Sequence, residues 1–179
     1  MRQKSIIEGS AFSSVLSFQR CNIPLSFVKW IANHTDVSCS DICVIGDTIP
    51  ITPHTVHVVL GIPTGGVEIN NVHNEAKEFF ENHYRKTKPL ISFFGSKLLD
   101  DKDKNNLCTE DVPRCFMTVA LSTFLCPNSD TYQSPKYLGP LVDVNSISNW
   151  DWSKFVYDWL ITYIGNFKKE NNSKSQHSK

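Results

Sequence analysis

Two histidines and several cysteines are the side chains of this chain with the clearest potential for chemistry. His54 and His57 lie three residues apart, a spacing at which two neutral imidazoles on one helix can share a metal ion. No glutamate follows in an H-E-x-x-H pattern, and His34, Cys39 and Cys43 lack the C-x-x-C spacing of a zinc knuckle. We therefore expect no metal site and no cofactor.

A catalytic cysteine would need a neighbouring base and a stabilised thiolate. Cys115 and Cys126 instead belong to an apolar helical segment, where burial would raise the pKa of a thiol and leave it inert. The turn Pro63-Thr64-Gly65-Gly66 is rich in glycine but has neither the GxxxxGK[ST] nor the GxGxxG pattern of a phosphate-binding loop. We expect no catalytic residue, and six reduced cysteines in all.

The composition narrows the class of protein. Among 179 residues, 18 are basic and 18 are acidic, so the formal net charge is zero, which argues against a surface that follows nucleic-acid phosphates. Hydrophobic residues make up 40% and charged residues 20%, a balance typical of a globular domain. No run approaches the roughly 20 apolar residues of a membrane span, and the start shows no secretory signal. We expect an intracellular, soluble protein without membrane contact.

Apolar periodicity predicts the elements that position these side chains. We expect a mainly α fold, a single compact helical domain with a small β-hairpin, over residues 10–168. The predicted helices cover residues 10–19, 24–33, 52–61, 74–84, 90–99, 109–126 and 151–168. The last of them carries Trp159 in a stripe of eight apolar residues that we expect to be central to the core. Residues 169–179 form a polar segment that we expect to be disordered.

Two of these elements carry strong local signals. Thr52 can cap a helix whose first position is Pro53, and Gly61 is placed to end that helix in a left-handed turn. Residues 42–51 alternate around Gly46-Asp47, which predicts a short hairpin, and Pro50 makes its second strand an edge strand.

The order of short motifs along the chain resembles the plant mobile domain family, also called aminotransferase-like, of main-like proteins and plant transposon-derived proteins. The resemblance covers about residues 12–167. Thr55 stands where the family usually has aspartate, and Lys154 and Asp158 replace small residues. The matching motifs are Trp30-Ile31-Ala32, Gly46-Asp47, residues 52–56, Leu60-Gly61-Ile62-Pro63, Gly65-Gly66, residues 116–124, Tyr137-Leu138 and residues 152–160.

The resemblance implies a non-catalytic protein-interaction module. It implies a nuclear location, a link to transposon silencing and meristem maintenance, and a protein partner, for which a plant protein phosphatase is one candidate. The label "aminotransferase-like" would imply pyridoxal phosphate, yet no lysine lies in the context of a phosphate-binding Schiff-base site. We expect no cofactor on this ground as well.

Two other functions stay open. The chain could be the upstream, non-catalytic part of a transposon-encoded ubiquitin-like-protein protease, although it contains no Asp-Cys-Gly nucleophile segment. It could also be a nucleic-acid-binding domain. For the interaction module, we expect Asp47, Thr64, Gly65 and Gly66 to form part of a partner-facing edge, because loops on a rigid scaffold often carry binding. The alternative for the glycines is that they only satisfy turn geometry.

Overall fold

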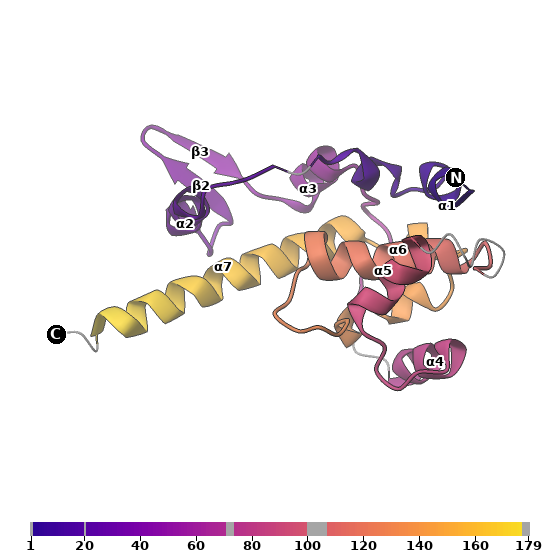
Figure 1. Ribbon diagram of the computed structural model, residues 1–179. Coiled ribbons are helices and arrows are strands. Elements are labelled where there is room, and N and C mark those ends of the chain that lie inside the picture. Colours follow the sequence, from indigo (N-terminus) through magenta and orange to yellow (C-terminus); the bar gives the residue numbers. More distant parts are fainter. Residues whose placement is uncertain (1, 20, 71–73, 100–106, 177–179) are drawn as a thin grey trace.

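Helix α7 (Trp152–Gln176) runs along most of the molecule and contacts two parts of it (Figure 1). The computed structural model describes residues 2–19, 21–70, 74–99 and 107–176. At its N-terminal end α7 packs in the larger part of the protein, whose core forms around α6 (Asp111–Ala120) and which we call the body. Farther along, it lies beside α2 (Leu25–His34) and the small sheet.

The described residues form seven α-helices and a three-stranded antiparallel sheet, which confirms the mainly α, single-domain prediction. Besides α2 and α7, the helices are α1 (Arg2–Glu8), α3 (Pro53–Leu60), α4 (Asn74–Tyr84), α5 (Ile91–Leu99) and α6 (Asp111–Ala120). The sheet consists of β1 (Thr35–Asp36), β2 (Asp41–Val44) and β3 (Asp47–Pro50), in that order. Short 3-10 turns cover Ser13–Ser17, Pro135–Tyr137, Gly139–Leu141 and Ile147–Asn149, and a π turn covers Leu121–Leu125.

The core of the body forms around α6, as its apolar periodicity predicts. Cys115, Met117 and Leu121 are fully buried on α6 and its π-helical continuation. Helix α6 contacts α5 and α1. Trp152, at the start of α7, is fully buried and meets the ring of Phe12 edge to face, with 5.8 Å between ring centroids. This pair joins the N-terminal segment to the last helix.

Helix α3 has the boundaries that its local signals predict. The Thr52 hydroxyl accepts a hydrogen bond from the Thr55 amide, and the Thr55 hydroxyl accepts one from the Thr52 amide. Gly61 ends the helix with a φ of 63°. Thr55, which departs from the aspartate of the resembled family, thus completes a capping box and satisfies a free amide at the helix start.

The chain departs from the expected boundaries at both ends. Helix α1 precedes residue 10 and buries Ile7 against the core, so the packed structure begins earlier than predicted. Only Ser13–Ser17 of the predicted helix 10–19 is helical, as a 3-10 turn. Helix α7 continues to Gln176, through a segment expected to be disordered, because neither glycine nor proline follows Gly165 to end it. Residues 177–179 lie outside the described residues.

The central role expected of Trp159 falls to Trp152 instead. Trp159 is half-buried and stacks on Tyr163, with 4.1 Å between ring centroids. In the apolar stripe of α7, Trp152 and Val156 near the start and Ile164 farther along are buried, whereas Tyr163 is 46% exposed.

Candidate functional site

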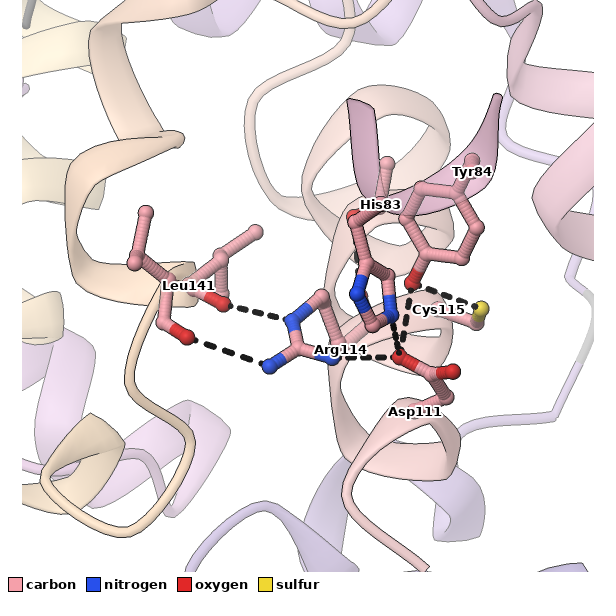
Figure 2. Close-up of polar contacts among 8 residues, drawn as sticks. His83, Tyr84, Asp111, Arg114, Cys115 and Leu141 are labelled. Atoms are coloured by element: carbon pink, nitrogen blue, oxygen red, sulfur yellow. Dashed lines mark hydrogen bonds and ion pairs between the residues drawn. The ribbon is translucent and has the colours of Figure 1, made fainter. Parts of the chain in front are cut away.

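Arg114 is the centre of a polar cluster inside the body (Figure 2). Its side chain is buried, with 3% of the residue exposed. The guanidinium donates to the carbonyl oxygens of Leu141, across 2.9 Å, and Val142, across 3.1 Å, and pairs with the carboxylate of Asp111. These hydrogen bonds and the ion pair replace the contacts that the guanidinium would make with water, and so they offset the energetic cost of burying its charge.

One carboxylate oxygen of Asp111 contacts the polar groups of three side chains, those of Arg114, His83 and Tyr84. His83 Nε2 lies 2.8 Å from that oxygen, and the Tyr84 hydroxyl donates to it across 3.2 Å. Burial raises the pKa of Asp111, but hydrogen bonds from His83 and Cys108 and the positive charges of His83 and Arg114 outweigh burial, so the pKa lies below its ordinary value. The cluster therefore holds a carboxylate in its charged form.

The same cluster contains a cysteine, but its geometry does not activate the thiol. The Cys115 sulfur lies 3.6 Å from the Tyr84 hydroxyl, whereas His83 is bonded to Asp111. Burial raises the pKa of Cys115 to about 11, and it raises the pKa of Cys126 to about 12. These thiols stay protonated at neutral pH. The cluster ties α4, α6 and residues 141–142 together rather than assembling a nucleophile, a base and an orienting group.

The candidate metal ligands do not converge. In the described ranges, no three His, Cys, Asp or Glu side chains are grouped so that they could hold a metal ion. The rings of His54 and His57 have centroids 6.1 Å apart, and His57 Nδ1 lies 2.7 Å from the carbonyl oxygen of Ile62. His57 is thereby tied to the turn that follows α3.

The glycines of the predicted partner-facing edge have structural reasons for their identity. Gly65 has a φ of 73°, in the left-handed region. A Cβ atom on Gly66 would lie 2.1 Å from the carbonyl oxygen of Asn149, so only glycine fits there. Val67 then bridges to Trp150 through backbone hydrogen bonds. Turn geometry accounts for both glycines, while Thr64 is exposed beside them.

Asp47 lies in another part of the molecule. It is exposed at the start of β3 and pairs with Val44 across the predicted hairpin turn. Figure 1 shows the β2–β3 hairpin at one end of the molecule, whereas the chain after α3 runs back toward the start of α7. The structure therefore does not bring Asp47 together with Thr64, Gly65 and Gly66 as one edge.

Asp47 belongs to a small unit that we call the α2–hairpin lobe, defined as residues 25–50, which contain α2, β1, β2 and β3. The inner side of the lobe is anchored to α7. The Ser40 hydroxyl lies 2.8 Å from the Tyr157 hydroxyl, and the Lys168 ammonium donates to the carbonyl oxygen of Thr35. Ala32 and Thr35 are buried at this contact.

Outside this contact, the lobe exposes an unusual amount of apolar surface. Three rings form a ladder along α2: Phe27 stacks on Trp30 and Trp30 on His34, with ring centroids 6.1 and 4.2 Å apart. The lobe's large apolar residues with exposed fractions between 38% and 103% are Leu25, Phe27, Val28, Trp30, Val44, Ile45 and Ile49. The spacing of Phe27 and Val28 indicates an apolar face on α2, and the fold leaves both side chains exposed.

Comparison with known proteins defines the class of this chain. It belongs to the family described as a domain of unknown function, DUF8566, which matches residues 1–178. No curated protein and no solved structure matches the chain. In the described part of the chain, no helix combines the length and apolar composition needed to cross a bilayer.

Proposed function

We propose that this chain is a non-catalytic protein-interaction module of the plant mobile domain type. It acts in the nucleus, in a role linked to transposon silencing and meristem maintenance, and it binds a protein partner. The nuclear setting, and a plant protein phosphatase as a candidate partner, come from the resemblance of the motifs. The observation that carries the proposal is the exposed apolar surface of the α2–hairpin lobe.

The chemistry of this surface favours a protein as its ligand. Contiguous apolar patches on soluble proteins commonly mark contacts with other proteins, and aromatic residues are enriched in such contacts. Phe27 and Trp30 expose 53% and 40% of their surfaces in a stacked arrangement that needs little further ordering. The zero net charge supports a protein rather than a nucleic acid as the partner.

The polar cluster around Arg114 supports the non-catalytic part of the proposal. Each polar group in it is bonded to another group of the fold, and its thiol has a raised pKa. Nothing in this arrangement provides an activated nucleophile.

Photo-crosslinking from defined positions tests the proposed function. We would place a photoreactive residue at Trp30, at Ile45, or at Leu99, which is 83% exposed on α5 and lies outside the lobe. After irradiation in plant nuclear extract, we expect the same protein adduct from the two lobe positions and none from Leu99. The captured protein is then identified, purified and titrated against the native chain.

Two charge reversals give a matched comparison. Asp47→Lys lies in the lobe and is expected to weaken binding of the purified partner, whereas Thr64→Lys lies outside it and is expected to leave binding unchanged. Equal crosslinking from all three positions would contradict the proposed surface. Turnover of a ubiquitin-like conjugate, or of an amino acid with pyridoxal phosphate, would defeat the non-catalytic interpretation.

A further inference from the structure

We infer that the partner bound by the α2–hairpin lobe is a second copy of this chain, in a two-fold symmetric dimer. This inference rests on the proposed function, because it names the occupant of the same surface. Three properties of the lobe support it: the size of its apolar surface, the presence of charges of both signs, and its firm attachment to α7.

The exposed apolar area matches what a stable dimer needs. Taking about 150–250 Å² for a whole large side chain, the seven exposed apolar residues of the lobe leave roughly 700 Å² uncovered. The largest apolar patch on a typical monomer is about 300–600 Å². A standard interface covers about 800 Å² on each partner. The lobe alone therefore comes close to the area that one subunit of a dimer contributes.

The lobe carries charged side chains of both signs. A two-fold interface must be self-complementary, because each residue meets the partner's copy of a different residue or of itself. Among the described residues, Lys29, Asp36, Asp41 and Asp47 of the lobe take part in no ion pair, so its acidic groups outnumber its one lysine. The lobe thus offers both signs of charge beside its apolar residues. The whole chain has zero formal net charge, so two copies do not repel each other.

The side chains of α2, rather than the free edge of the sheet, are the contacting groups. The sheet has two edge strands: β3 ends in Pro50, which has no amide hydrogen to donate to another strand, and β1 is only two residues long. The ladder of Phe27, Trp30 and His34 instead presents flat rings that can pack against the same ladder of a second copy.

Attachment to α7 keeps this surface in place before binding. Lys168 and Tyr157 hold the inner side of the lobe through Thr35 and Ser40. The surface is therefore largely ordered in one copy, which lowers the entropic cost of association.

Sedimentation equilibrium of the full 179-residue chain tests the inference. Over a range from about 1 µM to several hundred µM, we expect a reversible shift from the 20.3 kDa monomer to twice that mass. Trp30→Glu is expected to weaken dimerisation by at least about tenfold. Leu99→Glu, which places the same charge outside the lobe, is expected to have no effect.

Ile45→Glu is a second lobe variant, which controls for the possibility that Trp30→Glu weakens dimerisation by unfolding the chain. Ile45 is 103% exposed at the hairpin turn, so its replacement removes no packing within one copy. We expect this variant to keep the circular dichroism spectrum and thermal midpoint of the native chain and still to dimerise more weakly. A chain that stays monomeric over the whole range would overturn the inference, as would a dimer that neither lobe variant weakens.

The two proposals fail in different ways. A monomeric chain whose lobe crosslinks to another protein overturns the second copy as occupant and leaves the interaction module standing. A monomeric chain whose lobe crosslinks to nothing overturns both.

Discussion

The Nε atom of Arg114 donates a hydrogen bond to the carbonyl oxygen of Leu141 across 2.9 Å, although 27 residues separate the two along the chain (Figure 2). This contact joins α6 to the 3-10 turn Gly139–Leu141. Because Asp111 holds the other side of the guanidinium, the carboxylate sets the orientation in which Arg114 reaches the backbone.

Replacing Arg114 tests how much this tie contributes. Arg114→Leu removes the cation paired with the Asp111 carboxylate and leaves two carbonyl oxygens without their side-chain donor, so we expect the free energy of unfolding to fall by about 3–5 kcal/mol. Urea denaturation measures the change. Lys136→Leu removes an exposed cation and is expected to change stability by less than about 0.5 kcal/mol. If Arg114→Leu were as stable as the native protein, the hydrogen bonds would merely offset the cost of burying the charge.

Asp111 makes stability depend on pH in the acid range. Its pKa in the folded protein lies below the ordinary value of about 3.9, so its stabilisation is complete above that value and is lost as the pH falls through the lower, folded pKa. We expect Asp111→Asn to lower stability at neutral pH and to flatten the loss of stability below about pH 4. Asp47→Asn, at an exposed position without an ion pair, serves as the control. Parallel acid profiles for native protein and Asp111→Asn would refute this role.

The cysteines are expected to divide into two classes by reactivity. Cys21, Cys39, Cys43 and Cys108 are exposed, whereas Cys115 and Cys126 are buried. The raised pKa values of the two buried thiols, about 11 and about 12, leave almost no thiolate at pH 8. Alkylation followed by mass spectrometry should label four sites rapidly and the last two only after denaturation. Rapid labelling of all six would show that the core opens readily.

Two glycine substitutions are expected to act in opposite directions. Gly66→Ala would place a methyl group against the backbone of Asn149, so we expect a loss of at least about 1–3 kcal/mol. Gly95 lies within α5, and a methyl group added there would meet no neighbouring side chain within 4 Å, so Gly95→Ala is expected to stabilise the protein by about 0.5–1 kcal/mol. Thermal and urea unfolding of both variants provide the measurement. A neutral Gly66→Ala would mean that the loop is free to move away.

Local signals made some elements of the fold predictable. Thr52, Pro53 and Gly61 define α3 because a cap, a first-turn proline and a left-handed end act within a few residues. The hairpin was predictable for the same reason, but Val44 pairs with Asp47, so its turn lies at Ile45-Gly46 rather than at Gly46-Asp47. Helix α1 was not, since its one buried residue, Ile7, gives no periodic pattern.

The two candidate sites were beyond the reach of sequence patterns. Arg114 binds the backbone carbonyls of residues 141 and 142. Every residue has a backbone carbonyl, so residue types do not predict this contact. The spacing of Phe27, Trp30 and His34 indicates that α2 has an apolar face, but periodicity does not say whether the protein covers that face. The apolar spacing favours core packing for Trp30, and that interpretation is wrong, because 40% of Trp30 is exposed.

The continuity of α7 has a consequence for the spacing of any assembly. The helix has 25 residues and is therefore about 37 Å long, with the body packed near its first turns and the α2–hairpin lobe held farther along. Because one continuous helix carries both the body and the lobe, whatever binds the lobe is held in a set position relative to the body.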